Sequence, residues 1–307
     1  MLKKFVYLFL IVAGTSLMTS CGSSSSDKKS ESSSDELISA DSLGTDAPLK
    51  LSEEVISDVI QNISSPVEMA SLIKSTGVAF SQKILNDPDK VDNYNTSFKR
   101  ALNLGVFASD LGYINIFDKN SIVVSYLVAV KNLAEGIKVG QFFDFNALKR
   151  LATNSNNLDS LMEISVSSFN DMDSYLREQN RSNVSSLIVT GTWVEGMYIT
   201  ASVIEKTNNK DLVDRLAEQK DIVNILLIIL ENYKNDQNFA DLSKYLQDLK
   251  DLYSQVKITT EFGEPKKMEV DGSLIIVQDE ISHVEITPEQ VTAIINQIKK
   301  IREYIVS

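Results

Sequence analysis

The sequence predicts an all-α protein, a multi-helix bundle of about eight to ten helices with a small β-hairpin-like insertion near 266–286. Three observations support this fold class. First, 43% of the 307 residues are hydrophobic, which is enough to bury a sizeable core. Second, the chain has only 12 Gly and 5 Pro, so it suits long helices better than a turn-rich β fold. Third, apolar residues recur at helical spacing from Leu51 to the C-terminus, with one interruption at 258–286.

Helices are expected first over 66–85 and 90–116. The segment Ser65-Pro66-Val67-Glu68 is a capping box with Pro at the first helical position, so it predicts the start of the first helix. Asn86-Asp87-Pro88-Asp89 breaks the helical pattern and separates the two helices.

Four further helices are expected before residue 207. One follows Asp118-Lys119-Asn120 and ends by Gly140, and a short one follows Asp144. Another is capped by Asn156 or Asn157, and the next covers about 181–206.

The remaining chain predicts three helices and the insertion. Residues 210–235 are expected to form one helix, central to the bundle because 222–230 is apolar nearly all round. A helix over about 238–255 follows. The stretch 258–286 is rich in β-branched residues around an Asp-Gly pair, which indicates a small hairpin. Thr287-Pro288-Glu289-Gln290 is a second capping box and starts a C-terminal helix with a regular Ile stripe.

Composition excludes several classes of function. The chain has 30 Lys+Arg against 42 Asp+Glu and a net charge of −12, which argues against a nucleic-acid surface. A single Cys excludes a disulfide framework, and one Cys with one His cannot build a Cys/His zinc site. The sequence has no P-loop, HExxH, GxSxG or GxGxxG signature. We therefore expect a non-enzymatic protein with no cofactor.

The N-terminal residues predict an export signal. Lys3 and Lys4 precede a 13-residue apolar run, FVYLFLIVAGTSL, over 5–17. A helix needs about 20 apolar residues to span a bilayer, so this run predicts a removable leader. It is followed by Met-Thr-Ser and then Cys21, the only Cys of the chain.

This arrangement resembles the type II signal peptide and lipobox of bacterial lipoproteins. The resemblance implies that a signal peptide, 1–20, is removed and that Cys21 becomes the lipidated first residue, with acyl chains such as palmitate on its sulfur and on its amino group. Met18 departs from the family, which usually has Leu there. Gly22 after the Cys, in place of Asp, resembles lipoproteins sent to the outer membrane; the periplasmic and the surface face both stay open. The alternative is an ordinary secreted protein that is cut nearby and has a chance Cys.

A Ser-rich stretch follows the leader. Residues 23–34, SSSSDKKSESSS, contain eight Ser in twelve and no apolar side chain. Such a composition cannot offset the entropy of ordering the backbone, so 21–48 is expected to be a flexible tether. The single helical-bundle domain is expected over 49–307.

Two apolar helices each carry one acid with a Tyr three residues later and a Gly before it. Their blocks are GVFASDLGY over 105–113 and GTWVEGMY over 191–198. The i,i+3 spacing places each carboxyl and its phenol on one helix face. A carboxylate inside an apolar helix is costly unless it is paired, so each acid needs a partner or a ligand. The hypothesis is a pocket between the two helices that takes a cation or a small polar ligand, lined by Asp110, Tyr113, Trp193, Glu195 and Tyr198.

The alternative for these blocks is structural: both acids cap or bridge neighbouring helices of the bundle. The small residues beside them would let another helix approach closely, and the two copies hint at a duplicated helical unit. The stretch from about 95 to 205, which carries both blocks, resembles helical lipoproteins of the Bacteroidota, and this resemblance brings no activity with it.

Three functions follow from these observations. The first is a membrane-anchored envelope lipoprotein that acts as a non-enzymatic binding or scaffold module, with the membrane and other envelope proteins as partners. The second is a solute- or metal-binding protein that uses the two acid/Tyr helices. The third is an envelope hydrolase acting through His283, the only His, for which an exposed position on a strand is the expected alternative.

Overall fold

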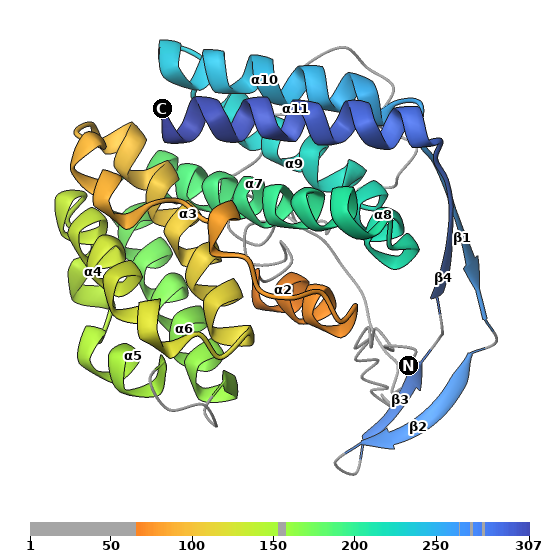
Figure 1. Cartoon of the computed structure of the whole chain (residues 1–307), viewed down its shortest axis with the longest axis horizontal. Helices are drawn as coiled ribbons and strands as arrows, with labels where there is room; N and C mark the ends of the chain where they lie inside the picture. The colour runs from red at the N-terminus through yellow and green to blue at the C-terminus, as the bar shows by residue number, and fades with distance from the viewer. Residues whose placement is uncertain (1–65, 153–157, 264, 271–272, 278–279) are drawn as a thin grey trace, which may run out of the picture. The chain divides into compact units, whose positions relative to one another are not determined.

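The structure, a computed structural model, describes residues 66–307 except 153–157, 264, 271–272 and 278–279. It confirms the predicted fold class: the described residues form ten α-helices and a small β excursion near the predicted insertion (Figure 1). The expected leader, Cys21 and the tether lie outside the described residues.

The described helices and strands have the following bounds. The α-helices are α2 (Pro66–Ser75), α3 (Ser97–Ile116), α4 (Asn120–Gly136), α5 (Phe145–Ala152), α6 (Leu158–Glu178), α7 (Ser182–Thr207), α8 (Lys210–Ala217), α9 (Lys220–Glu231), α10 (Gln237–Tyr253) and α11 (Pro288–Val306). Short 3-10 turns cover Gln82–Ile84, Pro88–Asn93 and Gly140–Phe142. The strands are β1 (Lys257–Phe262), β2 (Lys266–Val270), β3 (Ser273–Val277) and β4 (Glu280–Glu285).

Helix α7 is the centre of the bundle. It packs most extensively on α3 and also contacts α2, α6, α8, α9 and α11. Among the described residues it is the one helix long and apolar enough to cross a membrane, but 83% of its apolar window is buried inside the protein. Core helices of globular proteins have the same composition, so α7 is accounted for by burial in the bundle.

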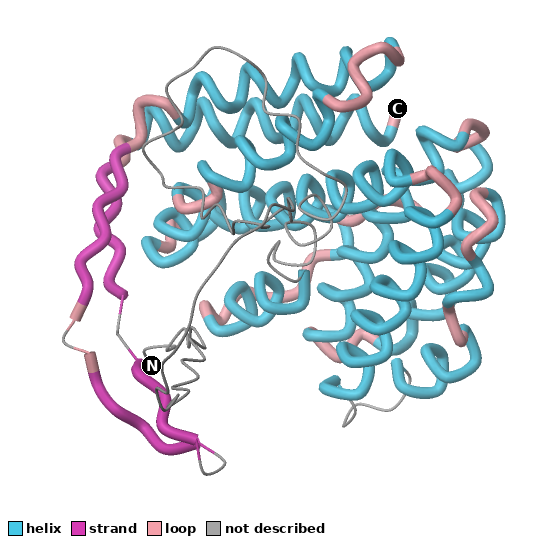
Figure 2. The backbone as a smooth tube through the Cα atoms, turned by 180° about the vertical axis from the view of Figure 1, so that it is seen from behind, coloured by secondary structure: helices cyan, strands magenta, loops and turns pink. Residues whose placement is uncertain are grey.

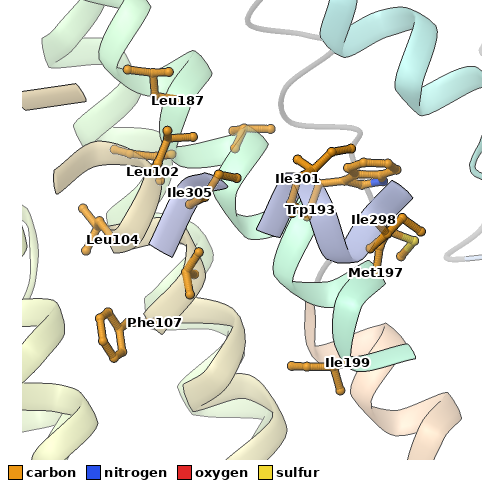
Figure 3. Close-up of a cluster of buried hydrophobic side chains, with 14 of the residues drawn as sticks. Leu102, Leu104, Phe107, Leu187, Trp193, Met197, Ile199, Ile298, Ile301 and Ile305 are labelled. Carbon is orange, nitrogen blue, oxygen red and sulfur yellow. The ribbon is translucent and has the colours of Figure 1, made fainter. Parts of the chain in front are cut away.

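The other helices form two groups around the α3–α7 pair. Helix α4 packs on α3, α5 on α4, and α6 on α5 and α7; α9, α10 and α11 form the second group, with α11 alongside α10 and against α7 (Figures 1 and 2). Figure 3 shows the apolar core where α3, α7 and α11 meet. Its labelled side chains are Leu102, Leu104, Phe107, Leu187, Trp193, Met197, Ile199, Ile298, Ile301 and Ile305.

Two predicted helices near the start begin or end elsewhere. The helix expected over 66–85 ends at Ser75, because Gly77 adopts a left-handed conformation with φ of +77° and turns the chain away. The helix expected over 90–116 begins only after Thr96, whose hydroxyl accepts a hydrogen bond from the Lys99 N–H at 3.1 Å. The chain between α2 and α3 is therefore a long connection with two short 3-10 turns.

The single helix expected over 210–235 is two helices, α8 and α9. The break falls at Gln219, which is buried and whose side-chain carbonyl accepts a hydrogen bond from the Trp193 indole at 3.0 Å. The expectation that this stretch is central to the bundle, because 222–230 is apolar nearly all round, is also wrong. Its buried face carries Val223, Leu226, Ile229 and Leu230, whereas Ile222, Ile225 and Leu227 are only partly covered.

The β excursion consists of two paired segments. Strand β1 pairs with β4, and β2 pairs antiparallel with β3 in a register that sets Met268 opposite Ile275. Val270 and Ser273 are opposite each other, so the strands are joined by the predicted Asp-Gly pair, which lies outside the described residues. Contacts assign Thr259–His283 to a compact unit separate from the bundle.

The predicted capping box of α11 is present. The Thr287 hydroxyl accepts from the Gln290 N–H at 3.3 Å, and the Gln290 side chain accepts from the Thr287 N–H at 2.8 Å. We expect Thr287→Ala to lower the free energy of unfolding by about 0.5–2 kcal/mol, measured by urea denaturation. Thr292→Ala is the control, because that exposed hydroxyl bonds only to the Pro288 carbonyl within α11. Equal losses in the two variants would show that the cap contributes nothing specific.

Candidate functional site

The two acid-bearing helices cross at their glycines. A Cβ atom at Gly191 would lie 2.0 Å from the Leu102 carbonyl oxygen, and one at Gly105 would lie 2.1 Å from the Ile188 carbonyl oxygen. Only Gly allows the two backbones to approach this closely. This confirms that small residues of the two blocks let another helix come near, and that helix is the partner block itself.

Gly191 of α7 meets Leu102 of α3, and about two turns further along α3 the Ser109 hydroxyl donates to the Thr192 carbonyl at 2.7 Å. Asp110 directly follows Ser109 on α3, and Glu195 lies three residues after Thr192 on α7. The close crossing therefore brings Asp110 and Glu195 together inside the bundle.

Glu195 is paired with an arginine of the C-terminal helix. The Glu195 side chain is fully buried, and its two oxygens accept from Arg302 Nε at 3.0 Å and Nη2 at 3.2 Å. The Arg302 guanidinium also lies over the Tyr198 ring, 4.6 Å from its centre. A two-point pair of this geometry fixes both orientation and distance, so it positions α11 on α7.

Asp110 is also fully buried, and its carboxyl lies close enough to that of Glu195 for the two groups to affect each other's pKa. Its Oδ2 accepts from the Asn86 backbone N–H at 3.1 Å, while Oδ1 receives no hydrogen bond from any donor group of the described chain. Burial raises the pKa of Asp110 well above its usual range, and the negative charge of Glu195 adds to this effect. Burial also raises the pKa of Glu195, but Arg302 opposes that rise. Of the two acids, Asp110 has the more strongly raised pKa.

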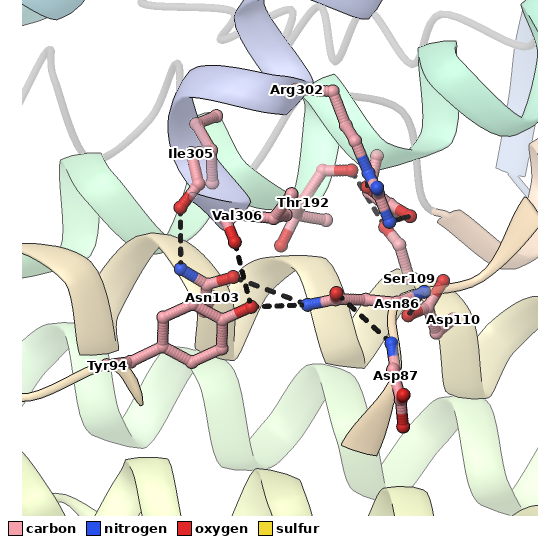
Figure 4. A network of polar contacts seen from close by, with 11 residues as sticks. Asn86, Asp87, Tyr94, Asn103, Ser109, Asp110, Thr192, Arg302, Ile305 and Val306 are labelled. Carbon is pink, nitrogen blue, oxygen red and sulfur yellow. Dashed lines mark hydrogen bonds and ion pairs between the residues drawn. The ribbon is translucent and has the colours of Figure 1, made fainter. Parts of the chain in front are cut away.

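A network of neutral polar groups surrounds the acids. The Asn86 side-chain amide donates to the Tyr94 hydroxyl at 3.0 Å, and the Asn103 amide donates to the Ile305 carbonyl at 2.9 Å (Figure 4). The Tyr94 hydroxyl in turn donates to the Val306 carbonyl at 3.4 Å. The last turn of α11 is thus bonded to α3 and to the connection between α2 and α3.

Of the five predicted pocket residues, the structure brings Asp110, Glu195 and Tyr198 together. Trp193 lies elsewhere, because two residues along a helix correspond to about 200°, so it faces away from Glu195 and packs near α11 core residues (Figure 3). Tyr113 is buried against Phe80 at 5.2 Å between ring centres, and its hydroxyl accepts from the Ser81 N–H. Both contacts of Tyr113 are made by the segment after Gly77, Phe80 and Ser81, which the sequence predicts to be helical.

The sequence reasoning missed the residues that complete the cluster. Arg302 follows Ile298 by four positions at the edge of the C-terminal Ile stripe, so a cation beside an apolar stripe was the available signal. Asn86 belongs to the segment 86–89, whose composition predicts a break between helices, and nothing in the neighbouring sequence indicates that its side-chain amide is buried. The roles of Tyr94 and Asn103 depend on the α11 carbonyls, 212 and 202 residues away in sequence.

The other candidate for chemistry is His283 on β4. As expected, it is an exposed strand residue; its Nε2 lies 3.5 Å from the Glu261 carboxylate of β1. Within the described ranges, no group of three or more His, Cys, Asp or Glu side chains is arranged to hold a metal ion.

Comparison with known proteins adds no assignment. No family model matches the chain, and no curated protein and no solved structure is significantly similar to it.

Proposed function

We propose that this protein is a lipid-anchored protein of the bacterial cell envelope, held at the outer membrane by acyl chains on Cys21, and that its helical bundle is a non-enzymatic binding or scaffold module. One observation carries the proposal: Lys3 and Lys4, the 13-residue apolar run and the small residues stand in order before the only Cys.

The physical properties of the chain suit such an anchor. Each buried methylene contributes about 0.8 kcal/mol, so several acyl chains on Cys21 make membrane attachment effectively permanent. Residues 21–48 would give the bundle a reach of about 30 Å if they behave as a flexible coil. Loss of Lys3 and Lys4 with the leader changes the net charge from −12 to −14, so the bundle is repelled by anionic lipid head groups.

The bonding of the acid cluster favours a scaffold over a solute- or metal-binding protein. Both Glu195 oxygens accept hydrogen bonds from Arg302, and one Asp110 oxygen accepts from the Asn86 backbone N–H. A cation or polar ligand would have to displace Arg302 to reach the Glu195 carboxyl. The cluster therefore serves as a bridge between helices, which was the structural alternative for the two blocks.

The lipid anchor is tested by Cys21→Ser in the producing cell. We expect the unchanged protein to incorporate labelled palmitate and to sediment with membranes, and the variant to lose the label. A matched control adds Ser23→Cys to Cys21→Ser, which restores a thiol two positions away and is expected to stay unlabelled. Labelling of Cys21→Ser, or membrane retention of its processed form, would contradict the proposal.

The module's role is tested by two further measurements. Capture of the anchored protein from cross-linked membranes is expected to return envelope proteins in a fixed ratio. A thermal-shift screen with metal ions and small cations is expected to leave the melting temperature unchanged. A ligand that binds the native state must raise it, so a clear rise would favour the solute- or metal-binding alternative.

A further inference from the structure

Asp110, Glu195 and Arg302 combine two buried carboxyls with one guanidinium. Asp110 and Glu195 are both fully buried, and the Arg302 side chain is 15% exposed. If both acids were ionised, the cluster would carry a net negative charge inside the bundle, which costs several kcal/mol. With one proton retained the cluster is neutral.

The hydrogen bonds indicate which oxygen holds that proton. Both Glu195 oxygens accept from Arg302, and Asp110 Oδ2 accepts from the Asn86 N–H. Asp110 Oδ1 accepts from no donor group of the described residues. A proton on Oδ1 donated to the neighbouring Glu195 carboxyl satisfies this oxygen and completes the bonding of the cluster.

We propose that Asp110 and Glu195 form a proton-binding site that holds α11 against α3 and α7, so that loss of the shared proton at raised pH loosens the C-terminal helix. The inference does not depend on the lipid anchor or on the partner of the module.

The connection to α11 is direct. Arg302 lies within α11, four residues before its end, and both of its hydrogen bonds to described residues go to Glu195. The same end of the helix is bonded through the Ile305 and Val306 carbonyls to Asn103 and Tyr94. A change of charge at Asp110 therefore acts on the groups that attach this end of the helix.

The other ionisable groups near Asp110 and Glu195 do not change their charge around neutral pH. Burial raises the pKa of Tyr94 and of Tyr126, so both phenols stay neutral around neutral pH. Arg302 keeps its charge, because Glu195 raises its pKa. The titratable and charged groups that interact with the pair are Tyr94 before α3, Tyr126 of α4 and Arg302 of α11, and Tyr198 of α7 packs on Arg302.

The sign of the pH dependence follows from the raised pKa of Asp110. When α11 has detached and Asp110 is exposed to water, its pKa has the ordinary value of 3.8. When α11 is packed on the bundle, the pKa of Asp110 is higher, so the proton is held to a higher pH. The stabilisation is complete below the ordinary value and is lost as the pH rises toward and through the raised one. Between these two values the equilibrium constant for opening rises by up to about tenfold per pH unit.

Hydrogen exchange of the last two turns of α11 tests the proposal on the full chain. We expect the protection factors of these amides to fall by up to about tenfold per unit between pH 5 and 8. Asp110→Asn should remove this slope, because the amide can donate to Glu195 and accept from Asn86 without titrating. Asp173→Asn is the control; that buried aspartate pairs with Arg177 of its own helix, and the slope should persist. Equal slopes in the unchanged protein and Asp110→Asn would overturn the proposal.

Infrared spectroscopy supplies a second measurement that does not depend on the variants' stability. The unchanged protein should show the C=O stretch of a protonated carboxylic acid at neutral pH, and Asp110→Asn should lack it. Glu195→Gln should lack it too, because Asp110 becomes the counter-ion of Arg302 and ionises. Absence of the band in the unchanged protein, or its persistence in Asp110→Asn, would also overturn the proposal.

Discussion

Gly191→Ala is expected to lower the free energy of unfolding by at least about 3 kcal/mol, at or above the upper end for overpacking of a core. The new methyl group would stand 2.0 Å from the Leu102 carbonyl oxygen, a backbone atom that cannot rotate away. The α3–α7 pair would have to separate, and this pair is the most extensive helix contact of the bundle. Urea denaturation measures the loss, and failure to fold at all agrees with it.

Gly196→Ala is the matched control on the same helix. A Cβ atom at Gly196 would meet nothing within 4 Å, so the change adds no contact. Ala is more favourable than Gly inside a helix, so this variant should be unchanged or more stable by up to about 1 kcal/mol. If Gly191→Ala and Gly196→Ala behave alike, the helices do not cross at Gly191.

The sequence predicts the helices themselves well where periodicity and caps agree. The expected helix at 181–206 and the capping box at Thr287 both appear, because helical spacing and capping are local properties of the chain. The boundaries failed at Gly77 and at Gln219. At these points the chain leaves the helix to form contacts with distant residues, such as the bond between Gln219 and Trp193.

The candidate site was predicted in part for the same reason. A lone acid in an apolar helix requires a partner, so Asp110 and Glu195 could be singled out from their own surroundings. The identity of the partner could not be derived, because Arg302 is 107 residues away from Glu195 and only the packing of α11 on α7 brings it close. The orientation of Trp193 was available from helix geometry, since residues 193 and 195 cannot share a face.

Arg302→Met is expected to lower the free energy of unfolding by about 3–5 kcal/mol, because it leaves the Glu195 carboxyl buried without its cation. Glu195 must then be protonated to stay inside the bundle. Since burial already raises its pKa and Arg302 is the group that opposes the rise, the loss should be larger at pH 8 than at pH 5. Denaturation at both pH values measures this difference.

The double variant Glu195→Gln, Arg302→Met distinguishes the effect of the unpaired Glu195 charge on stability from the effect of losing the packing of the Arg302 side chain. Removing both charges abolishes the unpaired carboxylate, so the double variant should recover most of the stability lost in Arg302→Met and lose the additional pH dependence that Glu195 causes in that variant. Asp110 should keep its proton in this background, because no cation remains to favour its ionised form. A double variant as unstable as Arg302→Met would mean that the Arg302 side chain stabilises α11 by packing on Tyr198 and its neighbours. Recovery would mean that the pair fixes the position of α11 while contributing little net stability.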